Sequence, residues 1–493
     1  MKNGQAADSG VEDAHGTRIH GAHRKWALAL GLVARLRVVV AVTVAVFICG
    51  GAASARASTQ ELTITVSDGT QLACGLVLPS GSPPPGGWPG LLLFHGLGQS
   101  HGEMDTIADA AFAPAGFASL ACDARGTGAS GGTFGLDGPK EVQDARDLFN
   151  WLAERSDVSD TQIGAFGLSL GGGAVWNAAA AGVSFKAIVP AITWTNLGSA
   201  LNPNGVPKDE LISQLADVIP FSRWDPSLTQ ARTDLLAGNV SAAVKSVEAA
   251  RSVRSKLHSL TVPTLLLQGR HDFLFDTDQA LAAYRLLAGP KRLYLGDLGH
   301  PPATNPTAEL PTYIGEAVAW FEHYLAGFEA VGGGVQLASD PWDGTVTIFK
   351  SPPPTRRMAV NLPGTKKMSC GTVVRSVRLP GGPLETFGDG YVAVRYSGQH
   401  SWAGLLATVS IKGTSTPVTV GATRVTKRAG AFRIPLSDQA VLIPRGKRLV
   451  VAVGNPVTGV FGSVCGAPPN ATPAITIGRI TLNLSLLKHP VSK

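Results

Sequence analysis

Two hydrophobic periodicities alternate through the first two-thirds of this 493-residue chain. Continuous apolar runs, such as residues 91–94 and 264–268, predict strands that are buried on both faces of a parallel sheet. Apolar residues at helical spacing lie between these runs, most clearly over residues 140–155. Strands that alternate with helices in this way are typical of an α/β domain.

The predicted elements begin with a hairpin of strands at 61–66 and 71–78. Further strands are predicted at 91–94, 117–121, 163–168, 187–191, 262–268 and 291–295. Helices are predicted at 104–113, 140–155, directly after Ser169, at 277–287 and at 311–328.

The pattern changes twice, and each change predicts a boundary. Residues 193–260 become helical and more polar between two sheet strands, which predicts a cap inserted over the strand ends. After residue 330 the helical signals stop, and short Val- and Thr-rich runs predict an all-β sandwich or jelly roll over 331–493. The α/β domain is therefore expected over 58–330.

The first 57 residues are predicted to be a secretory signal peptide. A basic region precedes an apolar core at 38–48, and A-x-A cleavage sequences follow it. The core is short for a membrane span, so an uncleaved anchor is the second reading. We therefore expect a secreted or cell-envelope protein that contacts a membrane only if this segment is retained.

Composition and charge narrow the classes of function. Hydrophobic residues make up 44% and charged residues 16% of the chain, which excludes a disordered protein. Of the formal net charge of +7, residues 1–57 carry +4 and the remainder carries +3. We see no concentrated basic stripe, so nucleic acid is not expected as a partner. The oligomeric state is left open.

Four cysteines remain after cleavage, and an even number in an exported chain permits disulfides. Cys370 and Cys465 are candidates for a staple in the β region. Cys74 and Cys122 fall in or beside strands and are equally well read as buried thiols. No Cys/His cluster has zinc spacing, so no zinc site is expected.

The motif G-L-S-L-G at 167–171 follows a predicted strand and opens a small-residue helix. This G-x-S-x-G pattern is the nucleophile elbow, in which a strained turn projects the serine above the sheet. The helix that follows directs backbone N–H groups at the site, where they can stabilise an oxyanion. Ser169 is therefore the predicted nucleophile.

A serine nucleophile needs a base and an orienting acid, which follow it in this fold in the order acid, then histidine. Asp272 lies just past the strand that ends at residue 268, and His300 follows the next strand. Asp276 is a rival for the acid, although it is also suited to cap the next helix. Asp297 is expected to be a solvated loop residue.

Two backbone N–H groups are predicted to form the oxyanion hole. One is the N–H of Leu170, directly after the serine. The other is expected from the loop after the strand at 91–94, where Leu97 is the candidate.

Residues 126–131 spell G-x-G-x-x-G after a strand, which is the dinucleotide-binding pattern. No helix opens at the last glycine, and Asp147 lies inside a predicted helix instead of at a strand end. We therefore do not expect a dinucleotide site.

Together these motifs resemble the α/β-hydrolase superfamily and, within it, the X-Pro dipeptidyl-peptidase/cocaine esterase group of serine hydrolases. The resemblance rests on D-A-R-G-T-G at 123–128, the elbow, G-R-H-D at 269–272 and His300. It extends more weakly to 432–436 and 443–449, which are similar to the group's C-terminal jelly roll, a galactose-binding-like domain. It implies hydrolysis of an ester or amide through an acyl-enzyme without a cofactor.

One feature departs from that group, whose members commonly use a tyrosine in the oxyanion hole. The loop here is H-G-L-G at 95–98 and contains no tyrosine. We therefore expect an exported acyl esterase first and an X-Pro dipeptidyl-peptidase-type enzyme second. A non-catalytic protein that binds a surface through its β domain is the third reading.

Overall fold

The computed structural model describes residues 58–379, 381–398, 402–465 and 475–492. The signal peptide predicted at 1–57 lies outside the described residues. Within the described parts of the chain, no helix is both long enough and apolar enough to cross a membrane.

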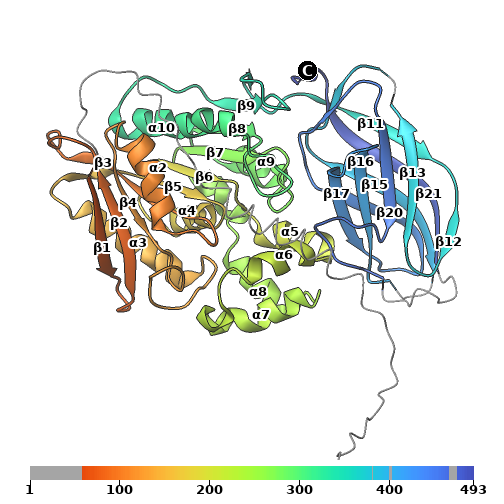
Figure 1. Cartoon of the computed structure of the whole chain (residues 1–493), viewed down its shortest axis with the longest axis horizontal. Coiled ribbons are helices and arrows are strands. Elements are labelled where there is room, and N and C mark those ends of the chain that lie inside the picture. Colours follow the sequence, from red (N-terminus) through yellow and green to blue (C-terminus); the bar gives the residue numbers. More distant parts are fainter. Residues whose placement is uncertain (1–57, 380, 399–401, 466–474, 493) are drawn as a thin grey trace, which may run out of the picture. The chain divides into compact units, whose positions relative to one another are not determined.

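A ten-stranded sheet forms the centre of the first domain (Figure 1). In spatial order its strands are β1 (Ser58–Thr65), β2 (Gln71–Leu78), β4 (Ala118–Cys122), β3 (Trp88–Phe94), β5 (Val158–Leu168), β6 (Ile188–Ala191), β7 (Thr264–Gly269), β8 (Lys291–Gly296), β9 (Gly334–Ala338) and β10 (Val346–Phe349). The strands from β4 to β9 are parallel to one another, and antiparallel strands complete both edges.

Helices cover both faces of this sheet. One face carries α2 (His101–Ile107), the π-helical turn η1 (Ala108–Phe112) and α10 (Leu310–Ala326). The other face carries α3 (Pro139–Ala153), α4 (Leu170–Ala180) and α9 (Thr277–Leu286). In strand β3, Leu92 packs into the core on one face of the sheet, and Leu91 and Leu93 pack into the core on the other face. Because both faces are buried, the run of residues is continuously apolar.

Between β6 and β7 the chain leaves the sheet and forms a helical insertion. Its helices are α5 (Leu197–Leu201), α6 (Asp209–Ala216), α7 (Pro226–Leu236) and α8 (Ala242–Ala250), with the 3-10 turns η2 (Pro203–Gly205), η3 (Phe221–Arg223) and η4 (Arg254–Ser259). A further turn, η5 (Thr307–Glu309), precedes α10. We call the insertion the cap.

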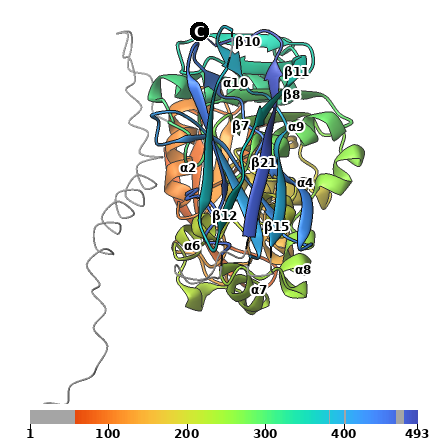
Figure 2. The same cartoon turned by 90° about the vertical axis from the view of Figure 1, so that its right-hand side faces the viewer.

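The remaining strands form a largely antiparallel β domain (Figure 2). They are β11 (Thr355–Leu362), β12 (Lys366–Met368), β13 (Thr372–Arg378), β14 (Leu384–Glu385), β15 (Gly390–Gly398), β16 (Gly404–Ile411), β17 (Pro417–Arg424), β18 (Ala429–Leu436), β19 (Leu442–Ile443), β20 (Arg448–Gly454) and β21 (Ile475–Leu487). The main sheet runs from β11 to β13 in space, and these two end strands approach each other, so it is nearly closed. The more specific jelly-roll assignment stays a prediction.

The domain boundary that the sequence predicts at residue 330 lies too early in the chain, because two further strands of the α/β sheet follow it. Strands β9 and β10 follow it, yet they extend the α/β sheet instead of joining the β domain. Val335 and Leu337 of β9 are fully buried in the core of that sheet. We therefore use "α/β domain" for residues 58–349, including the cap, and "β domain" for residues 350–493.

The structure pairs all four remaining cysteines. Cys74 and Cys122 stand opposite each other on β2 and β4 and form a disulfide. Cys370 and Cys465 form a second disulfide within the β domain. The sequence left open whether Cys74 and Cys122 are buried thiols or a disulfide, and in the structure they form a disulfide.

Candidate active site

Ser169 stands at a strained turn between β5 and α4. Its φ is 56° and its ψ is −112°, a conformation that side chains other than glycine rarely adopt. The neighbouring glycines make the turn possible, because a Cβ at Gly167 would overlap the carbonyl of Gly171, and a Cβ at Gly171 would overlap that of Phe94. The sequence G-L-S-L-G thus forms the sharp turn that the motif predicts.

The structure brings Ser169, His300 and Asp272 together from three separate strand ends. The Oγ of Ser169 lies 2.8 Å from Nε2 of His300, and Nδ1 of His300 lies 2.7 Å from Oδ2 of Asp272. The strands β5, β7 and β8 are parallel, so their carboxyl ends meet at one edge of the sheet. This arrangement can transfer a proton from the serine hydroxyl to the imidazole.

The carboxylate of Asp272 is completely buried and accepts four hydrogen bonds. Oδ2 accepts from both the backbone N–H and Nδ1 of His300, and Oδ1 accepts from the N–H groups of Leu274 and Phe275. Donation from Nδ1 leaves Nε2 of the neutral ring as the acceptor for Ser169. The rival, Asp276, stands at the N-terminus of α9 and does not contact His300.

The two residues expected to supply the oxyanion hole lie beside the serine turn. Leu170 is the first residue of α4, and the first N–H groups of a helix have no partner within it. Leu97 packs against the same apolar cluster as Leu170. The loop that carries Leu97 is closed by two hydrogen bonds, from the N–H of Gly96 to the side chain of Gln99 and from the N–H of Gln99 back to the carbonyl of Gly96.

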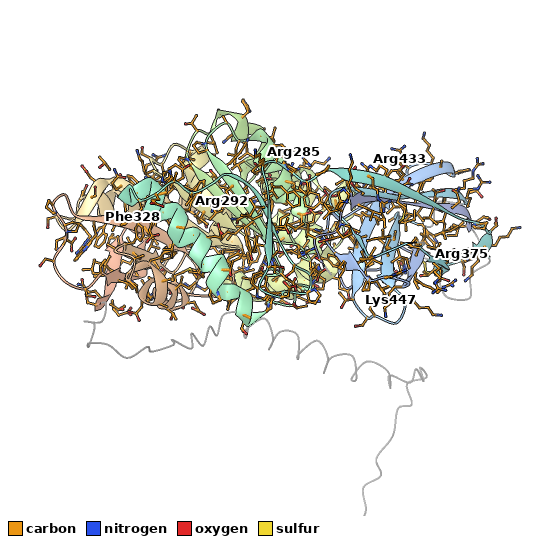
Figure 3. The ribbon with its side chains drawn as sticks, turned by 90° about the horizontal axis from the view of Figure 1, so that it is seen from above. Arg285, Arg292, Phe328, Arg375, Arg433 and Lys447 are labelled. Carbon is orange, nitrogen blue, oxygen red and sulfur yellow. A yellow bond between two sulfur atoms is a disulfide. The ribbon has the colours of Figure 1, made fainter. Side chains whose placement is uncertain are left out.

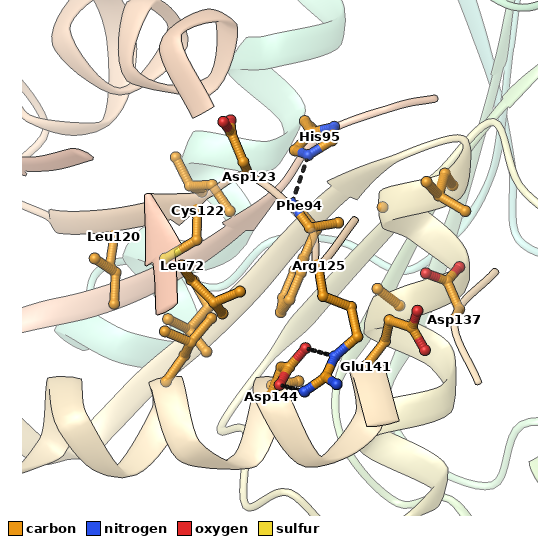
Figure 4. Close-up of a pocket in the computed structure, with 18 residues that line it drawn as sticks. Leu72, Phe94, His95, Leu120, Cys122, Asp123, Arg125, Asp137, Glu141 and Asp144 are labelled. Carbon is orange, nitrogen blue, oxygen red and sulfur yellow. Dashed lines mark hydrogen bonds and ion pairs between the residues drawn. The ribbon is translucent and has the colours of Figure 1, made fainter. Parts of the chain in front are cut away.

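The side chain of His95 connects this loop to Ala124 through hydrogen bonds. The ring is buried, with Nδ1 at 2.7 Å from the carbonyl of Gly96 and Nε2 accepting from the N–H of Ala124 at 2.9 Å (Figure 4). Burial lowers the pKa of His95, which keeps the ring neutral and able to accept this bond. Ala124, which lies just before the segment that resembled a dinucleotide loop, therefore supports the oxyanion loop through His95.

A small cavity lies under these elements (Figure 4), but it is not a substrate site. Its volume of about 40 Å³ suits a few water molecules, whereas an ester substrate needs several hundred. Its lining includes His95, Asp137 and the ion pair between Arg125 and Asp144, but neither Ser169 nor His300. Burial raises the pKa of Asp137 well above its usual range.

An apolar cluster surrounds the reactive atoms instead. Phe275 stands edge-on to the ring of His300, with 5.1 Å between ring centroids, and Trp194 packs against Phe275. The cluster also includes Leu170 of α4 and Ile219 of the cap. The site is thus built to receive apolar groups of a substrate.

One group of side chains in the described chain could hold a metal ion, namely Glu61, His101 and Asp105. His101 already forms ion pairs with both carboxylates, at 3.7 Å and 2.8 Å. Burial alone would lower the pKa of His101, but Asp105, Asp123 and Glu61 together raise it. The group contains none of Ser169, His300 and Asp272.

The comparisons with known proteins agree with this geometry. Residues 68–302 match the family model of X-Pro dipeptidyl-peptidases (S15 family), a span that includes Ser169, Asp272 and His300. The chain is a serine hydrolase. It resembles the X-Pro dipeptidyl-peptidase/cocaine esterase group, as the motifs predict.

Solved structures show the same fold at low sequence identity. A CocE/NonD family hydrolase from Staphylococcus aureus is 13% identical, covers 87% of this chain and 94% of its own, and has a TM-score of 0.65. An aminopeptidase from a marine sediment Thaumarchaeota archaeon is 14% identical, with coverages of 90% and 99% and a TM-score of 0.64. An α-amino acid ester hydrolase is also 14% identical, with the same coverages and a TM-score of 0.61.

A curated relative matches over a shorter stretch. The hydrolase is 33% identical over 109 residues to an uncharacterized 31.7 kDa protein encoded in the traX-finO intergenic region of Escherichia coli. This stretch is 22% of the chain, and it spans only 38% of the relative's length.

The β domain of the hydrolase binds the loop that carries Asp272, which the sequence did not predict. Nε2 of Gln439 donates to the backbone carbonyl of Asp272 at 2.8 Å. The fully buried guanidinium of Arg270 donates to the carbonyls of Ala440 and Ala338 and forms an ion pair with Glu385, which is also fully buried.

The cap holds the same loop from another side. Lys208 is almost completely buried, and its Nζ donates to the carbonyls of Phe273 and Leu274 at 2.7 Å and 2.9 Å. Burial lowers the pKa of Lys208. No local motif marks Lys208 or Gln439, because each acts on backbone carbonyls far away in the sequence.

A second buried charge network flanks the site. His271 lies between two carboxylates, with Nδ1 at 2.7 Å from Asp297 and Nε2 at 3.1 Å from Asp340. Burial alone would lower the pKa of His271, but the two carboxylates outweigh it and raise the pKa to about 9. Asp297 is buried, so the expectation that it is solvated was wrong.

This network predicts a loss of stability at alkaline pH. The pKa of His271 is raised from 6.5 to about 9 by folding, so its contribution is complete below 6.5 and disappears as the pH rises through 9. The loss is on the order of 3 kcal/mol of unfolding free energy. Thermal unfolding between pH 6 and 10 measures it, and the Tm of the parent should fall more steeply than that of His271→Gln. Equal slopes would contradict the assignment.

Proposed function

We propose that this serine hydrolase is an exported acyl esterase. Ser169 attacks the ester carbonyl while His300 accepts its proton, and Asp272 orients the ring and stabilises the imidazolium. His300 then returns the proton to the leaving alcohol, which leaves an acyl group on Ser169. Water, activated by His300, releases the acid and restores the serine. The 2.8 Å contact between Ser169 and His300 at the strained turn is the observation that carries this proposal.

The backbone N–H groups of Leu170 and Leu97 are proposed to bind the oxyanion of both tetrahedral intermediates. Donors that are fixed before the reaction act on charge that develops only in the transition state, so they lower its energy selectively. The bonds that hold the loop at His95 and Gln99 support this role, because they keep the N–H of Leu97 from rotating away.

An ester substrate is favoured over a peptide with a free amino terminus. Such a peptide needs an acidic partner for its ammonium group, and five of the six acids of the cap are already engaged, among them Asp234 with Gln230 and Glu248 with Asn202. Asp225 caps α7 and pairs with Lys140, Asp217 pairs with Arg232 in solvent, and Asp209 accepts the N–H of Gly462. Around His300 the cluster is apolar, which suits an acyl chain or an aromatic acyl group.

An X-Pro dipeptidyl-peptidase-type enzyme is the second candidate, and the family model over residues 68–302 favours it. Glu210 is the remaining cap acid, half-buried and with a pKa raised by burial. The non-catalytic alternative is set aside, because the chain is a serine hydrolase. Export rests on the segment at 1–57, and the jelly-roll assignment rests on the nearly closed antiparallel sheet.

The first test is labelling of residues 58–493 with a fluorophosphonate probe, mapped by peptide mass. We expect modification of Ser169 in the parent and none in Ser169→Ala. His300→Ala should lower both labelling and the kcat for a short acyl p-nitrophenyl ester by at least about 10⁴-fold. Folded parent that does not label would refute the triad.

The same preparations distinguish the two candidates. Short-chain p-nitrophenyl esters and X-Pro p-nitroanilides are compared by kcat/KM. Higher values for the esters support the acyl esterase, whereas faster release from the anilides would replace it with the peptidase. Glu210→Gln serves as a second variant, since only a peptidase that holds the substrate's ammonium there would show a raised KM.

Gln439 is predicted to be a positioning residue for Asp272. Gln439→Met removes one interdomain hydrogen bond, and a loss of about 1 kcal/mol in the transition state lowers kcat roughly five- to tenfold at unchanged KM. The matched control is Asn204→Gly, which removes the hydrogen bond from the side-chain amide of Asn204 to the carbonyl of Ala422. The φ of Asn204 is 56°, a backbone conformation that glycine adopts readily. Equal kcat losses in both variants would show that Gln439 only joins the domains.

A further inference from the structure

Charge is strongly segregated between the two domains. Residues 350–493 contain nineteen lysines and arginines but only three acids, which gives a formal net charge of +16. Residues 58–349 contain sixteen basic residues and twenty-nine acids, for a net charge of −13. The value of +3 found for the whole chain after residue 57 is therefore the sum of two large and opposite charges. The net charge of the whole chain thus conceals one strongly basic region and one strongly acidic region.

The basic side chains lie on the surface of the β domain, whereas two of its three acids are buried. Seventeen of the eighteen basic residues that the structure describes there are exposed. Glu385 is completely buried, and Asp438 is almost so. Asp389 is the single exposed acid of the described β domain, and it pairs with Arg357. The surface potential of this domain is thus positive nearly everywhere.

Five of these cations gather at the edge of the sheet where β13 pairs with β20. Arg378 stands directly opposite Arg448 in the antiparallel ladder, a like-charge pair that destabilises a sheet in isolation. The backbone N–H of Lys412 donates to the carbonyl of Arg448, and Arg445 and Lys447 form the turn before β20. We call these five residues the basic edge.

The basic edge has no protein counterion. Among the described residues, none of its five side chains forms an ion pair with an acid. Arg357 is the one described cation of the β domain that forms an ion pair, so what distinguishes the edge is the gathering of five cations and the like-charge pair within it. A cluster of like charges that costs stability and has no partner within the fold fits an anion from outside.

We propose that the basic edge docks the hydrolase on an anionic phospholipid bilayer. A surface of fixed phosphates attracts the β domain and repels the α/β domain, so the molecule adsorbs in one orientation. Two exposed apolar side chains, one near the start of β13 and one in the loop after β20, favour a bilayer over a soluble polymer. Val374 of β13 is 55% exposed and Val457 is 91% exposed.

Val457 lies in a loop that adjoins the start of β13, the strand that carries Val374. The N–H of Asn455 donates to the carbonyl of Gly371, which places the loop after β20 beside the start of β13. Along β13, Val374 and Arg378 share one face, because side chains four residues apart in a strand point the same way. The edge therefore combines cations with apolar side chains, as membrane-surface elements do.

The basic residues elsewhere on the domain provide a matched control. Arg395, Arg433 and Arg479 are exposed on β15, β18 and β21, none of which pairs with β13 or β20. Figure 3 shows Arg433 and Lys447 at opposite margins of the β domain. Changing three cations in either set removes the same net charge, so only the position of the charge differs.

The test is co-sedimentation of residues 58–493 with vesicles of phosphatidylcholine, with or without phosphatidylglycerol. We expect binding to the mixed vesicles alone, and loss of binding as ionic strength rises from about 0.05 M to about 0.5 M. The variant Arg378→Gln/Lys447→Gln/Arg448→Gln should partition roughly 100-fold more weakly. The control Arg395→Gln/Arg433→Gln/Arg479→Gln should stay within a few-fold of the parent.

Three results would overturn the proposal. Equal losses in both variants would mean that net charge acts without a defined edge. Binding to phosphatidylcholine alone, or binding that resists salt, would exclude an electrostatic contact. Binding to soluble polyphosphate without binding to vesicles would assign the edge to a soluble polyanion instead. Circular dichroism of each variant separates these results from misfolding, and none of the measurements depends on catalysis.

Discussion

The buried carboxylate of Asp272 is the constraint on which the active site depends. It accepts four hydrogen bonds and is shielded from water, so the loop from 270 to 275 can take only one path. Strand β7 delivers this loop, Lys208 of the cap holds its carbonyls, and Gln439 of the β domain holds the carbonyl of Asp272 itself. The catalytic geometry is thus a product of three parts of the chain, of which only one supplies the reacting atoms.

The reacting residues could be predicted because their positions follow from topology. In a parallel sheet the carboxyl ends of the strands converge, so the chain order serine, acid, histidine was sufficient to select Ser169, Asp272 and His300. Gln439 and Lys208 could not be selected in this way. Each donates to a backbone carbonyl, which every residue possesses, and Gln439 lies 167 residues from its partner. Such contacts leave no pattern in a single sequence.

Two other features of the structure were not predicted from the sequence, namely the place of β9 and β10 and the distribution of charge between the domains. Strands β9 and β10 were assigned to the β domain because short Val-rich runs suit a buried parallel strand and a sandwich strand equally well. The charge asymmetry was missed for a simpler reason, since opposite charges cancel in a sum over the whole chain. Counting charge separately in 58–349 and 350–493 would have found it without a structure. Only the structure shows that Arg378 and Arg448 stand opposite each other.

The buried acid Glu385 links the β domain, which carries the basic edge, to the loop of Asp272 in the active site. The buried carboxylate of Glu385 forms an ion pair with Arg270 and accepts hydrogen bonds from the backbone N–H groups of Val491 and Ser492. Substitution of one partner of such a buried pair leaves an uncompensated charge and costs about 3–5 kcal/mol. Arg270 and Glu385 therefore join the loop of Asp272 to the β domain as a pair that does not tolerate the loss of either member. An electrostatic torque on the outer surface is therefore transmitted to the whole hydrolase. Adsorption through the basic edge would fix the orientation of Ser169 relative to the membrane without any change in the geometry of the site.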